Sequence, residues 1–277
     1  MAGLAILGDR NLSYPTHREL DATLRLLPPS LDARWVASDS PEARAIDRFD
    51  GVWVVPGSPY RDDDAVLAAI GVARRSGLPL LGTCGGFQYT VLEFAREVAG
   101  LDAAHAELDH DAERPLIEQL PCSLVGQERT VTTVPGTRLA AICGERPFTG
   151  FHWCSFGLAD PYVERLEAHG LVISAHADDA GVEGIELSSH PFFLATLFQP
   201  QVGSLAGKPL HPLLAALLRL SRDGHRLLPR RLAGVSSLGR CATASSPSGT
   251  RASEACGRRG RRSLSRPRPT SASSAPG

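Results

Sequence analysis

A short apolar run that meets a glycine-rich turn is the feature that most constrains how this chain folds. It reads Leu78-Pro-Leu-Leu-Gly-Thr-Cys84-Gly-Gly-Phe-Gln88. The apolar residues predict a buried strand, and the residues after Cys84 predict a helix with an apolar stripe at helical spacing. Three glycines flank Cys84 and relieve the backbone crowding of a sharp strand-to-helix turn. The segment therefore predicts an α/β fold in which the Cys84 side chain projects from that turn.

The rest of the chain alternates short apolar runs with segments of helical periodicity, which predicts a parallel sheet covered by helices. Strands are expected over residues 4–7, 33–37, 51–55, 79–83, 171–174, 184–187 and 193–198. Helices are expected over residues 16–27, 40–46, 62–76, 85–98, 161–169 and 212–220. Residues 116–156 are richer in β-branched residues and turns, so this stretch is expected to be mostly strands.

The composition changes after residue 228. We expect one folded domain over residues 1–228 and a disordered Arg/Ser/Pro-rich tail over 229–277, because apolar periodicity ends there. The tail holds ten arginines and one glutamate but no aromatic residue to stack on bases, so we do not expect it to bind nucleic acid. Its role stays open.

Six cysteines show no zinc-type spacing, and no metal or cofactor is expected. The N-terminus lacks a basic leader, and no apolar run reaches the roughly 20 residues that span a bilayer. These features predict a cytoplasmic protein with free thiols and no membrane partner.

Cys84 carries the chemistry that the sequence suggests. A thiol at a helix N-terminus faces backbone amides, whose dipoles favour the thiolate. The amide that follows it is placed to hold an oxyanion. The alternative interpretation is a small buried cysteine at a glycine-rich turn.

Three segments resemble the glutaminase domain of CTP synthase, a class I glutamine amidotransferase. Gly82-Thr-Cys84-Gly-Gly-Phe-Gln88 resembles the segment around its nucleophile, and Asp50-Gly-Val-Trp-Val-Val-Pro-Gly57 resembles its oxyanion loop. Residues 182–201 resemble its last two strands. The resemblance covers residues 4–222 and is strongest to the stand-alone CTP synthase C-terminal-region-related (seleno)proteins. It implies a flavodoxin-like parallel sheet and a setting in pyrimidine nucleotide biosynthesis.

The resemblance also implies roles for individual residues. Cys84 would attack a glutamine amide to give a thioester. The amides of Gly57 and Gly85 would form the oxyanion hole, and Gln88 and Glu107 would contact the substrate.

The sequence departs from that family at the base. Where the family has Phe-His-Pro-Glu, this chain reads Phe198-Gln199-Pro200-Gln201, and a glutamine takes no proton near neutral pH. The stretch Phe151–Phe156 also lacks the arginine that grips the glutamine carboxylate in CTP synthases. No counterpart of the ATP- and UTP-binding synthetase domain is found, so CTP synthesis by this chain alone is not expected.

His152, in the segment that borders the family's glutamine pocket, is the candidate replacement base, and His105 is a weaker one. His190 is interpreted as a structural turn residue. The histidines at 17, 176 and 211 are expected on the surface or in loops.

Three functions follow as hypotheses. The first is a Cys84-dependent amidotransferase-like enzyme that hydrolyses glutamine poorly and acts on another small amide or acyl substrate, with a separate synthetase or acceptor protein as a partner. The second is a non-catalytic binding or regulatory module. The third is a thiol redox protein, which requires that the fold bring Cys154 to Cys84.

Overall fold

The computed structural model describes residues 2–178 and 180–227, and its main sheet joins a parallel half to an antiparallel half. The nine strands lie in the order β2-β1-β3-β4-β11-β10-β9-β6-β7. The parallel half consists of β1 (Ala2–Leu7), β2 (Leu31–Val36), β3 (Gly51–Val54), β4 (Leu80–Thr83) and β11 (Phe193–Thr196). Strands β3, β4 and β11 are buried along their whole length, which explains their nearly continuous apolar sequences.

The antiparallel half lies beyond β11. It consists of β10 (Gly181–Glu186), β9 (Val172–Ala177), β6 (Gln127–Thr133) and β7 (Phe148–His152). A separate pair joins β5 (Ile117–Gln119) to β8 (Phe156–Leu158). The expected α/β fold is confirmed, although only half of the sheet is parallel.

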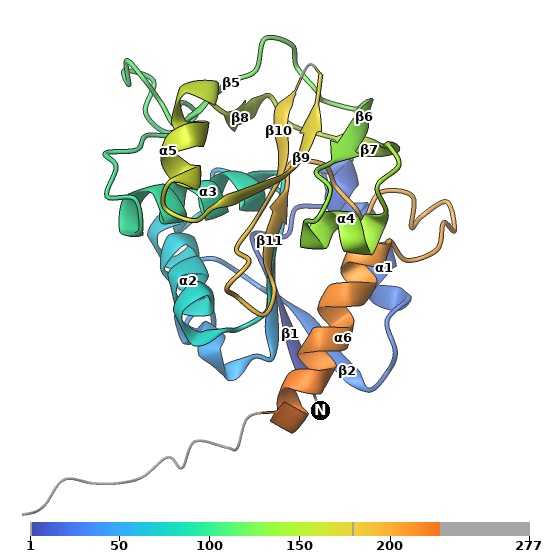
Figure 1. Cartoon of the computed structure of the whole chain (residues 1–277). Coiled ribbons are helices and arrows are strands. Elements are labelled where there is room, and N and C mark those ends of the chain that lie inside the picture. The colour runs from blue at the N-terminus through green and yellow to red at the C-terminus, as the bar shows by residue number, and fades with distance from the viewer. Residues whose placement is uncertain (1, 179, 228–277) are drawn as a thin grey trace, which may run out of the picture. The chain divides into compact units, whose positions relative to one another are not determined.

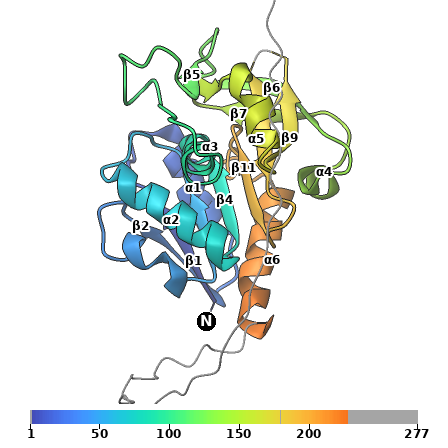
Figure 2. The ribbon, with the colours of Figure 1, turned by 60° about the vertical axis from the view of Figure 1, so that its left-hand side comes forward.

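Helices cover both faces of the sheet (Figures 1 and 2). Helices α2 (Asp63–Ser76) and α3 (Gly85–Glu97) pack on one face, while α1 (Pro15–Arg25) and α6 (Pro212–Leu227) pack on the other. The shorter elements are η1 (Ala43–Arg48), α4 (Arg138–Cys143), η2 (Asp160–Tyr162) and α5 (Val163–Glu167). Helix α4 interrupts the stretch that we expected to be mostly strands, because six residues are too few to show helical periodicity.

The carboxyl ends of the parallel strands place the site. Pro56 follows β3, Cys84 follows β4, and Gln199 follows β11. Strands β3, β4 and β11 are neighbours in the sheet, so these three segments meet at one edge. This is the edge at which open α/β sheets bind their ligands.

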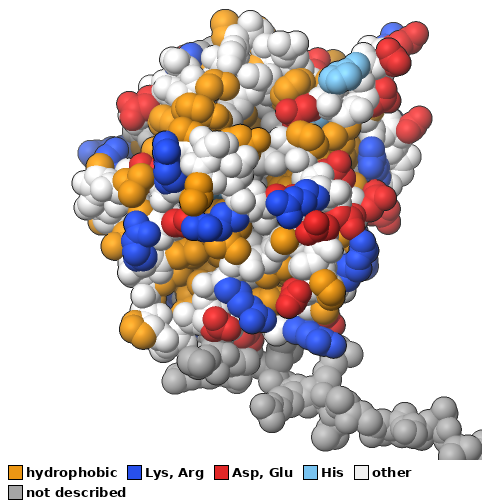
Figure 3. All heavy atoms as spheres, turned by 180° about the vertical axis from the view of Figure 1, so that it is seen from behind, with side chains coloured by type: hydrophobic (Ala, Val, Ile, Leu, Met, Phe, Trp, Pro, Cys, Tyr) orange, Lys and Arg blue, Asp and Glu red, His pale blue; other side chains and the backbone are white. Residues whose placement is uncertain are grey.

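The expectation of a disordered tail over 229–277 lies outside the described residues. Within the described part, no helix combines the length and the apolar character needed to cross a membrane. On the face in Figure 3, basic and acidic side chains are interspersed among apolar ones.

Candidate active site

Cys84 stands at the sharp turn that the sequence predicts. Its backbone has φ 53° and ψ −109°, and it is the only non-glycine residue with positive φ among the described residues. Such a conformation costs free energy and persists only where the surroundings enforce it. The Cys84 amide donates to the Thr196 carbonyl at 2.9 Å, which ties the turn to β11.

The glycines around the turn allow close backbone contacts. A Cβ at Gly86 would lie 2.1 Å from the Val54 carbonyl oxygen, and a Cβ at Gly82 would lie 2.5 Å from that of Gly86. Real side chains do not fit at these distances. Glycine at both positions therefore lets β3, β4 and α3 pack tightly enough to form the turn.

A loop after β3 lies against the turn. Gly57 has φ 117°, and a Cβ at Gly85 would lie 3.1 Å from the Ser58 nitrogen, so the loop and the start of α3 are in contact. The loop is held by His17, whose Nε2 lies 2.8 Å from the Pro56 carbonyl oxygen.

His17 is buried, which corrects the expectation that it lies on the surface or in a loop. Its Nδ1 accepts from the Asn11 amide at 2.9 Å, so Nε2 carries the proton and donates to Pro56. Burial lowers the pKa of His17, which keeps the ring neutral. This residue was missed because its role depends on a contact with a loop 39 residues away.

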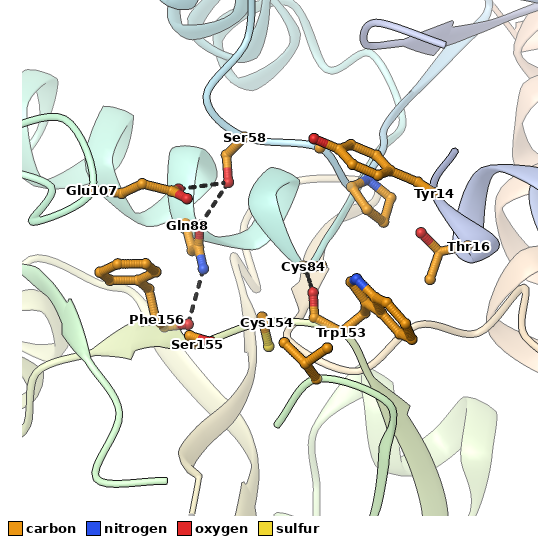
Figure 4. Close-up of a pocket in the computed structure, with 13 residues that line it drawn as sticks. Tyr14, Thr16, Ser58, Cys84, Gln88, Glu107, Trp153, Cys154, Ser155 and Phe156 are labelled. Carbon is orange, nitrogen blue, oxygen red and sulfur yellow. Dashed lines mark hydrogen bonds between the residues drawn. The ribbon is translucent and has the colours of Figure 1, made fainter. Parts of the chain in front are cut away.

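A cavity of about 210 Å³ opens at this edge of the sheet (Figure 4). Its lining residues include Tyr14, Thr16, Pro56, Gly57, Ser58, Cys84, Gln88, Glu107, Val125, Trp153, Cys154, Ser155 and Phe156. Glu107 is the one Asp or Glu among them, and no lysine or arginine belongs to this set of described residues. The pocket thus brings together Cys84, Gly57, Gln88 and Glu107, as the resemblance implied.

One polar network shapes the pocket wall. The Ser58 hydroxyl lies 3.1 Å from Glu107 Oε2 and 3.3 Å from Gln88 Oε1. The Gln88 amide nitrogen donates to the Phe156 carbonyl at 2.9 Å. Burial raises the pKa of the Glu107 carboxyl, and the Ser58 hydrogen bond opposes that rise.

His105 is hydrogen-bonded to two residues of this network and does not itself line the pocket. Its Nδ1 accepts from the Glu107 amide at 3.1 Å, so Nε2 donates to Gln88 Oε1, also at 3.1 Å. Burial is the main cause that lowers the pKa of His105 to about 4, and Arg96 adds to it. Both ring nitrogens are engaged, so His105 positions Gln88 and has no free nitrogen to act as a base.

The two glutamines after β11 bond to each other. Gln201 Nε2 donates to Gln199 Oε1 at 2.9 Å, and both side chains are buried. Gln199 Nε2 and Gln201 Oε1 have no hydrogen-bond partner in the described structure. Unpaired buried polar groups cost free energy, so this pair is not explained by stability alone.

His152 lies inside the sheet rather than on the pocket wall. Its Nε2 is 2.8 Å and 2.9 Å from the two carboxylate oxygens of Glu183 on β10, and both side chains are fully buried. Its Nδ1 has no hydrogen-bond partner among the described residues. His152 is not one of the lining residues, whereas its neighbours Trp153 and Cys154 are.

Comparison with known proteins identifies the family. Residues 17–208 match the family model of the class I glutamine amidotransferases. The chain belongs to this family.

Two curated relatives are CTP synthases. The enzyme of Archaeoglobus fulgidus is 36% identical over 207 residues, which is 68% of this chain and 38% of the relative. That of Methanopyrus kandleri is 32% identical over 212 residues, or 70% of this chain and 39% of the relative. The chain thus spans about two fifths of the length of these CTP synthases.

A solved structure agrees with the fold. The glutaminase domain of Trypanosoma brucei CTPS with bound acivicin superimposes with a TM-score of 0.69 at 24% identity. The match covers 80% of this chain and 94% of that domain. The expected flavodoxin-like architecture of the class I family is therefore confirmed.

Proposed function

We propose that this class I amidotransferase homologue uses Cys84 to form a thioester with a small amide or acyl compound, and that it hydrolyses glutamine poorly. One observation carries the proposal. Cys84 and Gly57 both have positive φ and line one pocket, while Gln199 and Gln201 pair with each other where the resemblance places the base and its carboxylate.

The chemistry follows from the atoms around Cys84. Its sulfur attacks the carbonyl carbon, and the resulting oxyanion accepts hydrogen bonds from the amides of Gly57 and Gly85. The carbon–nitrogen or carbon–oxygen bond then breaks, and the leaving group departs with a proton. Water or an acceptor molecule attacks the thioester and frees the thiol.

The charge of the pocket points to the substrate class. Glutamine presents a carboxylate, and none of the described lining residues is a cation that would bind it. Glu107 would repel that carboxylate but attract an amine. We therefore propose an amide, ester or activated acyl compound that has no carboxylate and is either neutral or carries an amine, placed by Ser58, Gln88 and Glu107.

The attack by Cys84 also needs a base that takes up the thiol proton. His152 remains the candidate, supported by its pairing with Glu183 and by the unpaired Nδ1, but its ring is enclosed. A base must come within hydrogen-bond reach of the thiol proton, directly or through one water. An activated acyl donor needs less help from a base than an amide does, so it is the favoured substrate.

We also propose a protein partner for this chain. A separate synthetase or acceptor protein would receive the acyl or amino group, since the CTP synthases that the chain matches are more than twice as long as the matched region. The competing proposal is a binding module that keeps the pocket without turnover.

Ammonia release from glutamine, measured together with the alkylation rate of Cys84, separates these functions. Fast alkylation at neutral pH without ammonia release supports an enzyme that has left glutamine hydrolysis. Alkylation of Cys84 as slow as that of the half-buried Cys143 would favour the binding module.

A further inference from the structure

Two cysteines meet in this pocket. Cys84 comes from the turn after β4, and Cys154 comes from the segment after β7; both line the cavity and both are buried. Cys84 Sγ donates to the Trp153 carbonyl oxygen at 3.6 Å. That carbonyl carbon is bonded to the nitrogen of Cys154, so the sulfur of Cys84 lies beside the Cys154 backbone (Figure 4).

The surroundings of Cys154 keep its thiol protonated. Interaction with the Cys84 side chain, followed by burial, raises the pKa of the Cys154 thiol well above its ordinary value. The Glu183 carboxylate adds to this rise. Cys154 therefore keeps its proton near neutral pH, and Cys84, at the N-terminus of α3, is the thiol that we expect to react first.

The other described cysteines lack this arrangement. Cys122 is exposed and Cys143 is half-buried, and neither lines the pocket. Burial alone raises the pKa of Cys143 to about 11. Among the described cysteines, only Cys84 and Cys154 are placed to react with each other.

We infer that Cys84 and Cys154 form a reversible redox pair, in which a hydroperoxide oxidises Cys84 and Cys154 then closes an intramolecular disulfide. The Cys84 sulfur attacks a peroxide oxygen, the O–O bond breaks, and Cys84 becomes a sulfenic acid while water or an alcohol leaves. The Cys154 sulfur next attacks the Cys84 sulfur. The S–O bond breaks, and the hydroxyl departs as water with the Cys154 proton.

Reduction returns both thiols. A dithiol reductant exchanges with the disulfide through a mixed disulfide and is itself oxidised to its own disulfide. While the bond exists, the proposed nucleophile is blocked, so oxidation switches the site off without destroying it. The inference needs no acyl substrate and is independent of the proposed acyl transfer.

Peptide mapping of the reduced full chain tests the pair. The chain is treated with hydrogen peroxide, its remaining thiols are alkylated, and its peptides are analysed by mass spectrometry without reduction. The expected product is a linked Cys84–Cys154 peptide that weighs two hydrogen atoms less than the separate peptides. Dithiothreitol should restore both thiols.

Two variants distinguish disulfide formation between Cys84 and Cys154 from non-specific oxidation of cysteines. In Cys154→Ser, peroxide should carry Cys84 to sulfinic acid, which dithiothreitol does not reverse. Cys122→Ser is the matched control and should form the same linked peptide as the unaltered chain. If Cys154→Ser does not fold, the peptide map of the unaltered chain still shows whether the Cys84–Cys154 disulfide forms.

Two results would overturn the inference. One is a Cys84 that reaches sulfinic acid in the unaltered chain without the linked peptide. The other is a disulfide from Cys84 to any of the four remaining cysteines. Neither result depends on activity, so the outcome is separate from that of the acyl-transfer proposal.

Discussion

Gln201 donates a hydrogen bond to Gln199 at 2.9 Å, in the two positions where the family resemblance places a histidine and a glutamate. Neither amide side chain carries a charge or takes up a proton near neutral pH. Each amide also leaves one buried polar atom without a described partner. The end of β11 in this chain therefore offers no general base at either position.

Restoring the base should raise the reactivity of Cys84. The double variant Gln199→His/Gln201→Glu should acylate about 10²-fold faster than the unaltered chain, because general base catalysis typically contributes that much or more. Stopped-flow measurement with an ester substrate checks this. Gln201→Glu alone is the control, since it adds a carboxylate without a base. An equal rate in all three proteins would mean that position 199 does not reach Cys84.

The pocket should discriminate against negative charge. The measured quantity is the rate of labelling by iodoacetate divided by the rate of labelling by iodoacetamide. This ratio should be at least about threefold lower at Cys84 than at the exposed Cys122, because Glu107 faces the pocket. Glu107→Gln should reduce the difference. The raised pKa of Glu107 means that the discrimination should fade on acidification at a higher pH than an ordinary glutamate would give. Faster labelling by iodoacetate would reveal a cation at the site.

Gly86 should be indispensable for the turn. Gly86→Ala places a Cβ 2.1 Å from the Val54 carbonyl oxygen, a backbone atom, and should destabilise the domain by at least about 2 kcal/mol. Gly3→Ala is the matched control, because its Cβ would meet Phe49 at an ordinary 3.5 Å. Urea unfolding measures both. Equal stability of the two variants would show that the contact is not as close as described.

The parts of the site that are formed by residues close together in the chain could be predicted from the sequence. The turn at Cys84 and the loop at Gly57 are recognisable because a strand, glycines and a helix follow one another within a few residues. Glu107 and Gln88 were placed by resemblance, and the structure brings both to the pocket.

The remaining features depend on contacts between distant residues. His152 pairs with Glu183, which is 31 residues away, and no pattern in either strand signals that contact. The antiparallel pairing of β6, β7, β9 and β10 was not anticipated either. The sequence pattern of a short strand does not indicate whether it runs parallel or antiparallel to its neighbours. Cys154 was noted as a partner of Cys84 only on condition that the fold brought them together, and both cysteines line the same cavity in the structure.

Acid should destabilise the domain through its buried neutral histidines. The pKa of His105 is lowered to about 4, below the unfolded value, so its contribution is complete above about pH 6.5 and is lost as the pH falls toward 4. The loss is roughly 3 kcal/mol at most. His105→Gln should make the unfolding free energy less dependent on pH in that window, while the exposed His176→Gln should not. Urea unfolding between pH 7 and pH 4 measures this, and an unchanged slope in His105→Gln would contradict it.

Acid-quenched mass spectrometry of the intact chain detects the proposed thioester on Cys84. The chain is incubated with glutamine, with a neutral small amide and with an activated ester, and each reaction is stopped in acid to preserve a thioester. We expect an acyl adduct on Cys84 with the activated ester, its absence in Cys84→Ser, and neither adduct nor ammonia with glutamine. Glutamine turnover at the rate of an intact class I amidotransferase, or no adduct on Cys84 with any donor, would contradict it.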